Sequence, residues 1–304
     1  MVHHAVALCC LALLACGDGP APASAHDAAA LADGGPADGP TPDAPDAPAG
    51  CNGALHLCDR PLDQVAYATT HNAMSNDDDR WILPNQHHGI SRQLADGIRA
   101  LMLDTHYEEG RAMLCHAECG AGAKPLVEGL AEITSFLQAN PREVVTLIFE
   151  SYVSAADTEA AFRDADLLRF VRPQPRGAPW PTLRALIDAG QRLVVLTSDG
   201  GGAFPWYLDE WAYVWETPYA YRSAAEFTCR LDRGRADNAL FVLDHFLTNP
   251  VGLPELAELV NHDPLLIDRA RQCQRESGLL PNFVTVDFYD IGDVLEAVRA
   301  LNAP

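Results

Sequence analysis

The stretch Val144-Val-Thr-Leu-Ile-Phe-Glu150 is almost continuously apolar and ends in a carboxylate. A strand that is buried on both faces has this pattern, because apolar and polar residues do not alternate along it. Seven further short runs, rich in Val, Ile, Leu and aromatic residues, resemble it: 65–70, 98–104, 112–116, 193–198, 212–216, 239–245 and 282–287. Eight such runs within residues 51–304 predict one α/β domain, an irregular (β/α)₈ TIM barrel, whose usual size is about 250 residues.

Segments with helical spacing of apolar residues lie between several of these runs. We expect helices at 125–140, 158–170, 180–189, 254–260 and 265–277. The gap between the second and third runs is too short for a helix, which indicates a hairpin-like connection and an irregular barrel there.

Polar side chains follow the expected strands at their carboxyl ends. They include His71, Asp104, His116, Glu150, Ser198, Glu216, His245 and Asp287. In a TIM barrel this end carries the active site. Two imidazoles near a carboxylate suit general acid–base chemistry, in which one accepts a proton and the other donates one.

The N-terminal residues predict export. Residues 1–16 contain a short apolar stretch and end in Leu13-Leu-Ala-Cys16, which resembles a lipoprotein signal with Cys16 as the lipidated residue. An ordinary secretory peptide is the alternative, since His3 and His4 replace the usual basic residues. Residues 17–50, nearly all Ala, Pro, Gly and Asp, predict a disordered tether. We therefore expect a monomer at the cell envelope, anchored to the membrane by lipid, or secreted.

Charge and cysteine content narrow the class of protein further. The formal net charge of −21 argues against binding to nucleic acid. Outside the signal, six cysteines remain, an even number that favours disulfides in an exported domain. Proximity in the sequence suggests the pairs Cys51–Cys58, Cys115–Cys119 and Cys229–Cys273. A zinc site is the competing interpretation, although the mature chain contains no Cys-x-x-Cys pair.

Several motifs together resemble the X domain of phosphatidylinositol-specific phospholipase C. They are Thr70-His-Asn-Ala-Met-Ser75, Gly97-Ile-Arg-Ala-Leu-Met-Leu-Asp104, Leu114-Cys-His116, Asn140-Pro-Arg-Glu-Val-Val-Thr-Leu-Ile-Phe-Glu150, Arg192-Leu-Val-Val-Leu-Thr-Ser198 and Pro281-Asn-Phe-Val-Thr-Val-Asp-Phe-Tyr289. The resemblance covers essentially all of 51–304. It implies cleavage of a phospholipid or glycolipid, with phosphatidylinositol as the model substrate, through a cyclic inositol phosphate.

The resemblance also implies roles for individual residues. His71 matches the general base, His116 matches the general acid, and Asp287 is a candidate for the carboxylate that orients His71. Glu216 and His245 are weaker candidates for the substrate pocket.

A positive partner for the phosphoryl oxygen is also required. Asp104 stands where secreted bacterial enzymes carry an arginine, whereas Asn72, Asp104 and Glu150 match calcium-ligand positions of the eukaryotic enzymes. A fourth ligand position falls on Met102, which cannot bind Ca²⁺. We expect a weakly bound Ca²⁺, with His106 as the alternative cationic group that would contact substrate.

Two other functions remain open at this point. A glycerophosphodiesterase or a sphingomyelinase D-like enzyme would use the same kind of barrel. A tethered binding module without catalysis is less favoured, because both histidines are present.

Overall fold

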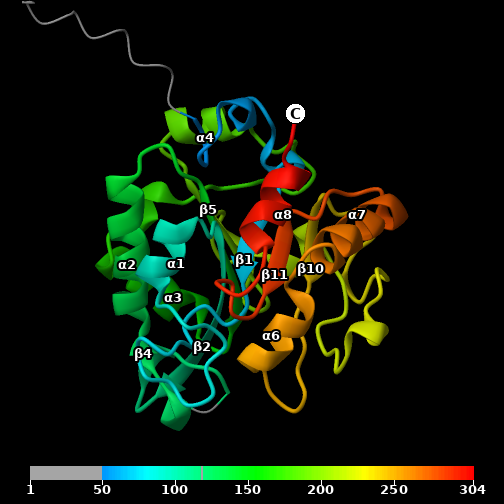
Figure 1. Ribbon diagram of the computed structural model, residues 1–304. Coiled ribbons are helices and arrows are strands. Elements are labelled where there is room, and N and C mark those ends of the chain that lie inside the picture. Colours follow the sequence, from blue (N-terminus) through cyan, green and yellow to red (C-terminus); the bar gives the residue numbers. More distant parts are fainter. Residues whose placement is uncertain (1–49, 118) are drawn as a thin grey trace, which may run out of the picture. The chain divides into compact units, whose positions relative to one another are not determined.

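A computed structural model describes residues 50–117 and 119–304 (Figure 1). The expected signal at 1–16, with Cys16, lies outside the described residues, and so does the expected tether except for Gly50. Within the described part of the chain, no helix is both long enough and apolar enough to cross a bilayer.

The centre of the domain is a curled sheet in the order β7-β6-β5-β2-β1-β11-β10-β8-β9. All neighbours in this order pair in parallel except β8 and β9. Eight parallel strands therefore form the TIM-type barrel that the sequence predicts, with no pairing among the described strands between β7 and β8. These strands are β1 (Tyr67–Thr70), β2 (Ala100–Glu108), β5 (Val145–Ser151), β6 (Leu193–Thr197), β7 (Tyr207–Asp209), β8 (Val214–Glu216), β10 (Leu240–Asp244) and β11 (Phe283–Val286).

The expectation that residues 112–116 form a barrel strand is wrong. Strand β3 (Arg111–Leu114) instead pairs antiparallel with the far end of β2, and β4 (Lys124–Pro125) pairs with β3. The hairpin forms because β2 continues beyond the barrel, and Glu109 and Gly110 turn the chain with φ of 48° and 76°. The eighth barrel strand is β7, which has only three residues and was not predicted.

Helices cover the outside of the barrel (Figure 1). Four of the five expected helices form close to their predicted positions, whereas residues 158–170 divide into α3 and a short 3₁₀ turn at Leu168–Phe170. Helix α3 begins earlier than predicted because the Ser154 side chain accepts a hydrogen bond from Asp157 N and caps it. The helices are α1 (Ile90–Asp96), α2 (Leu126–Ala139), α3 (Ala155–Asp164), α4 (Leu183–Asp188), α5 (Glu210–Tyr213), α6 (Pro254–Val260), α7 (Leu265–Ser277) and α8 (Val294–Leu301).

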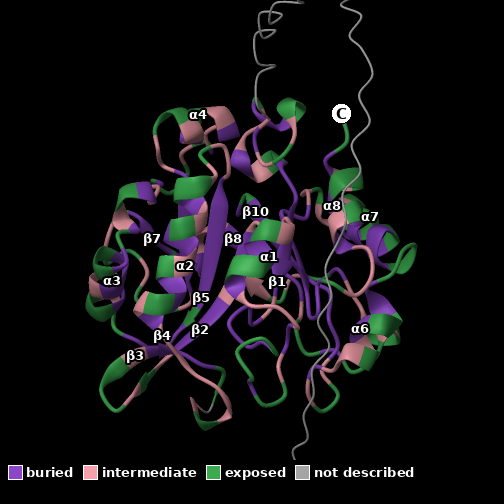
Figure 2. Ribbon diagram, turned by 60° about the vertical axis from the view of Figure 1, so that its left-hand side comes forward, coloured by how far each residue is buried: buried purple, intermediate pink, exposed green. Residues whose placement is uncertain are grey.

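The barrel strands are buried and the helices present their outer faces to solvent (Figure 2). Every residue of β1, β6, β8, β10 and β11 is buried, as expected for parallel strands that are covered on both faces. The hairpin of β2 and β3, the strand β4 beside it, and helix α6 lie toward the end of the barrel where the parallel strands finish (Figures 1 and 2).

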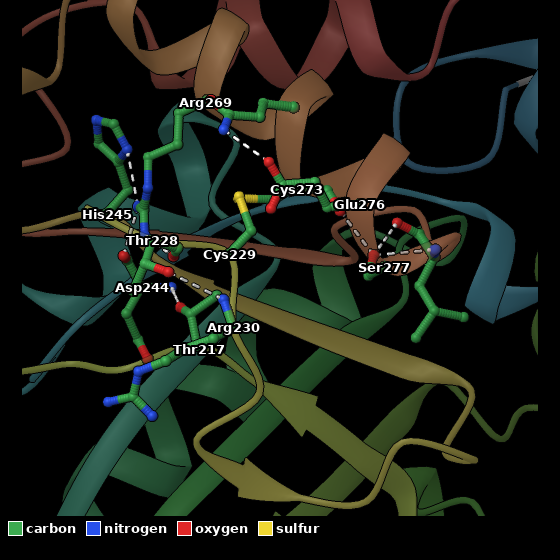
Figure 3. Close-up of a disulfide and its surroundings, with 12 residues drawn as sticks. Thr217, Thr228, Cys229, Arg230, Asp244, His245, Arg269, Cys273, Glu276 and Ser277 are labelled. Carbon is green, nitrogen blue, oxygen red and sulfur yellow. Dashed lines mark hydrogen bonds between the residues drawn. A yellow bond between two sulfur atoms is a disulfide. The ribbon is translucent and has the colours of Figure 1, made fainter.

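All six cysteines of the domain form disulfides, and the three pairs are those expected from proximity in the sequence. The zinc interpretation is therefore excluded for these cysteines, since none has a free thiolate to bind metal. One disulfide, Cys115–Cys119, closes a short loop that contains His116. Another, Cys229–Cys273, joins the segment before β9 to helix α7 (Figure 3).

Candidate active site

The first histidine of the site, His71, directly follows β1. Its backbone N–H donates to Val286 O on β11 (3.0 Å), and its carbonyl accepts from Gln86 Nε2 (2.8 Å). The ring atom Nδ1 lies 2.8 Å from Oδ1 of Asp287, which is buried just after β11. Because this bond occupies Nδ1, Nε2 is the ring nitrogen left for substrate.

The second histidine, His116, comes from the β3–β4 connection. Its Nδ1 lies 2.6 Å from Oδ2 of Asp104, a buried residue of β2. The hydrogen bond with Asp104 raises the pKa of His116, while burial raises the pKa of Asp104. His116 therefore keeps its proton to a higher pH than a free histidine, which suits a general acid.

The Asn72 amide lies between the two histidine–aspartate pairs. One of its terminal atoms is 3.2 and 3.3 Å from the Asp104 oxygens, and the other is 3.2 Å from His71 Nε2 and 3.3 Å from His116 Nδ1. Its backbone has a φ of 46°, a left-handed conformation that Asn tolerates well. The three expected catalytic residues and two expected metal ligands, Asn72 and Asp104, thus form one cluster at the carboxyl ends of the barrel strands.

Glu150 and His106 lie beside this cluster. Glu150 is the register partner of Asp104 on the adjacent strand, and its Oε1 accepts a hydrogen bond from Tyr152 OH at 2.6 Å. That bond raises the pKa of Tyr152 to about 12. His106 stacks on the Tyr152 ring with centroids 4.4 Å apart, so it belongs to an aromatic pair beside the two histidine–aspartate pairs.

The structure corrects the expectation that Glu216 and His245 contact substrate. Both are fully buried. Both carboxylate oxygens of Glu216 accept hydrogen bonds from Arg233, at 2.6 and 2.7 Å. His245 donates from Nε2 to Val260 O (2.8 Å) and accepts at Nδ1 from Arg269 (3.1 Å), and burial lowers its pKa to about 3. Neither side chain has an exposed polar atom for a ligand.

Two further contacts support the His71–Asp287 pair, and the sequence did not indicate either of them. Asn85 Nδ2 donates to Asp287 Oδ1 at 3.1 Å, so this oxygen accepts two hydrogen bonds. Phe246 stacks on the His71 ring with centroids 4.0 Å apart and planes inclined by 8°. The position of Phe246 just past β10 is the only sequence signal that could have indicated it, because strand ends meet at this edge.

Further buried carboxylates lie on β8, β10 and the short helix α5: Glu216, Asp244 and Glu210. Burial raises the pKa of Glu210, Glu216 and Asp244, and the negative charge of Glu216 raises the pKa of Glu210 and of Asp244 further. Asp244 Oδ2 has no hydrogen-bond partner. Arg233 packs over the rings of Trp211 and Tyr219 while it pairs with Glu216.

The donor chemistry fits a weakly held hard cation. Asp104 supplies two carboxylate oxygens, and the Asn72 amide oxygen faces them when its nitrogen is turned toward Asn85 Oδ1 (3.3 Å). Glu150 lies one strand away, although its carboxylate is turned to Tyr152. Among the described residues, no group of three or more His, Cys, Asp and Glu side chains is arranged as a ready metal centre. A Ca²⁺ ion held by two protein residues and water would be bound weakly, because Ca²⁺ sites usually supply six to eight oxygen ligands.

The barrel resembles solved phospholipase C structures. The phosphatidylinositol-specific phospholipase C of Listeria monocytogenes matches with a TM-score of 0.55 and 16% identity, over 81% of this chain and 96% of that one. A Staphylococcus aureus phosphatidylinositol-specific phospholipase C matches with a TM-score of 0.55 and 12% identity, over 81% and 95%. At these identities the likeness establishes the fold, that of phospholipase C-like phosphodiesterases.

The family model for the PI-PLC X domain matches residues 57–302, and the chain belongs to this family. A PI-PLC X domain-containing protein of Arthroderma benhamiae is 29% identical over 83% of this chain and 89% of its own length. An Arabidopsis thaliana protein described by the same domain is 29% identical over 80% of this chain, and an uncharacterized secreted protein of A. benhamiae is 28% identical over 80%. The chain spans 63% and 61% of these last two relatives.

Proposed function

We propose that this protein cleaves phosphatidylinositol, or a related phospholipid or glycolipid, by intramolecular attack on the phosphodiester. The observation that carries the proposal is the arrangement of two imidazoles, each oriented through Nδ1 by a buried carboxylate and bridged by Asn72. Family membership and the phospholipase C-like fold support the same reaction class.

In the proposed reaction His71 Nε2 accepts the proton of the inositol 2-hydroxyl as its oxygen bonds to phosphorus. His116 Nε2 donates a proton to the glycerol oxygen as the phosphorus–oxygen bond breaks. The products are a cyclic inositol phosphate and diacylglycerol, and the two histidines exchange their protonation states. Asp287 stabilises the imidazolium that forms at His71, while Asp104 orients His116.

We also propose that Ca²⁺ is the positive partner. Asn72 and Asp104 would hold it, with Glu150 as a third ligand after its carboxylate turns from Tyr152. When bound, the ion would neutralise charge that develops on the phosphoryl oxygens. His106 remains the alternative partner, because it lies two residues beyond Asp104 on the same face of β2.

An extracellular location agrees with the three disulfides and with the secreted relative. We propose that the mature chain is attached to the cell envelope through lipid on Cys16. Radiolabelled fatty acid should enter the wild-type chain and not a Cys16→Ser variant; equal labelling of the two would contradict this attachment.

Phosphorus NMR of the protein with phosphatidylinositol vesicles tests the catalytic proposal. We expect a cyclic phosphate signal that is absent with His71→Ala and with His116→Ala. His262→Ala is the matched control, since this exposed histidine pairs with Glu258 and Asp293 outside the site. A cyclic product that persists in either catalytic variant would refute the mechanism. Activity only on glycerophosphodiesters or sphingomyelin would instead support the alternative enzymes.

The same assay tests the cation. Chelator should abolish turnover and added Ca²⁺ should restore it. Full activity in chelator would contradict the Ca²⁺ assignment and favour His106, whose substitution by Ala should then remove the residual activity.

A further inference from the structure

The segment that follows β10 covers the His71–Asp287 pair. Phe246 is only 3% exposed and lies parallel to the His71 ring at 4.0 Å. Farther along, Gly252 approaches the carboxylate so closely that a Cβ there would lie 2.5 Å from Asp287 Oδ2 and 3.0 Å from Asn85 Nδ2. One short segment therefore packs against both members of the pair.

The two residues that precede Phe246, Asp244 and His245, lie beside Arg269 (Figure 3). Arg269 on α7 donates to Asp244 O at 2.6 Å and to His245 Nδ1 at 3.1 Å. The opposite nitrogen of His245 donates to Val260 O. Because Cys273, one turn beyond Arg269, is bonded to Cys229, α7 cannot move away from this corner independently. His245 thus has a structural task, to hold the chain just before Phe246.

A histidine ring needs such support because its second side-chain torsion has only a broad preference. The bond to Asp287 fixes the direction of Nδ1 but allows the ring to tilt about that bond. A flat apolar side chain against one face removes this freedom and excludes water from that face.

We propose that Phe246 is a positioning residue for His71, holding the ring so that Nε2 faces the substrate. This inference rests on the proposed role of His71 as general base. Phe246 itself does not contact the reacting atoms in this assignment; it acts through the imidazole.

The first test is kinetic and compares Phe246→Leu with Phe246→Tyr. Leucine retains apolar bulk without a flat face, and we expect kcat to fall about tenfold, equivalent to about 1.4 kcal/mol of transition-state stabilisation, with KM changed less than twofold. Tyrosine retains the face and should restore most of kcat. Phe170→Leu is the matched control, because Phe170 is also nearly buried but packs against Arg169 and Arg192; its kcat should equal wild type.

The second test needs no substrate. In NMR spectra of the wild-type chain, the carbon-bound ring protons of His71 should be shifted upfield by the Phe246 ring, and its Nδ1–H should be protected from exchange by Asp287. Phe246→Leu should lose the upfield shift and broaden the Nδ1–H signal, whereas Phe246→Tyr and Phe170→Leu should preserve both. If Phe246→Leu is too unstable to study, Phe246→Met provides the same comparison.

Failure of this inference and failure of the proposed function give different results. Unchanged His71 signals and unchanged kcat in Phe246→Leu would refute the positioning role while leaving the mechanism intact. Full activity of His71→Ala would refute the proposed function. The positioning role of Phe246 would then have no catalytic consequence.

Discussion

Replacing Asp287 with Asn tests the first histidine pair most directly. Asp287 Oδ1 accepts hydrogen bonds from both His71 Nδ1 (2.8 Å) and Asn85 Nδ2 (3.1 Å), while Oδ2 is buried without a partner. An amide at this position should place its oxygen toward the two donors and its nitrogen at the Oδ2 position. The substitution then preserves the His71 tautomer and removes the negative charge alone.

The expected fall in kcat follows from the loss of the negative charge of Asp287. A hydrogen bond to a charged group exceeds a neutral one by about 1–1.5 kcal/mol, which sets the lower limit. At a charge separation of about 4 Å and an effective dielectric constant of about 20, the imidazolium–carboxylate attraction is about 4 kcal/mol, which sets the upper limit. We therefore expect kcat of Asp287→Asn to fall between about tenfold and about 1000-fold. His71→Ala, which removes the base itself, should fall further.

The assay is release of cyclic phosphate from phosphatidylinositol in mixed micelles, with kcat and KM determined separately. Circular dichroism at the assay temperature should show that Asp287→Asn is folded. A kcat within threefold of wild type would show that Asp287 does not stabilise the imidazolium. A kcat as low as that of His71→Ala would show that the amide oxygen does not keep the tautomer, contrary to the geometry with Asn85.

Three further predictions concern other parts of the site. Asp104→Asn should move the alkaline limb of the kcat–pH profile to lower pH, because the hydrogen bond that His116 donates to Asp104 raises the pKa of His116 and the acid must stay protonated. An alkaline limb that does not move would contradict this pairing. Serine at both Cys115 and Cys119 should lower kcat while KM changes little, because the loop that holds His116 is released; equal kcat would exclude a positioning role for the disulfide. The pKa of His245 is about 3 in the folded chain and 6.5 ordinarily, so the free energy of unfolding should decrease as the pH falls between these values, by up to about 1.4 kcal/mol per pH unit. Urea titrations at several pH values should show that the free energy of unfolding depends less on pH in His245→Gln than in wild type. The same pH dependence in both proteins would contradict this prediction.

Much of the barrel could be predicted because a buried parallel strand has a one-dimensional signature. Seven of the eight barrel strands coincide with continuously apolar runs. Strand β7 could not be predicted, because three residues are too few to show a hydrophobic pattern. The run 112–116 resembles a barrel strand because it is short and apolar. Leu114 is buried, but by packing in the core beside α2, where Gly129 leaves room for it. Helix α1 was not predicted, because its N-cap residue, Gly89, has no side chain that would mark the start of a helix.

The site could be predicted only as a set of strand ends. The strand-end criterion indicated His71 and Asp287, and it selected His116 through a run that forms a hairpin strand instead of a barrel strand. It did not show which carboxylate pairs with which imidazole, since that depends on the hairpin. His245 and Glu216 meet the same criterion, yet their side chains are bonded by Arg269 and Arg233 from distant segments. A strand-end residue and its long-range partner are separated by too much sequence for any local pattern to connect them.

Glu150 can act in two ways, by binding Ca²⁺ or by repelling the anionic substrate, and the charge of the site predicts a different result for each. A general base must begin neutral, so the His71–Asp287 pair carries one negative charge when substrate arrives, and an ionised Glu150 adds another near Asp104. An anionic phosphodiester is repelled by both. If Glu150 binds Ca²⁺, Glu150→Gln should raise the Ca²⁺ concentration needed for half-maximal activity, and Tyr152→Phe, which frees the carboxylate, should lower it. If Glu150 only repels substrate, Glu150→Gln should increase kcat/KM in chelator. A higher Ca²⁺ requirement of Glu150→Gln would therefore show that the carboxylate serves the cation, and a higher kcat/KM of this variant in chelator would show that it opposes the substrate.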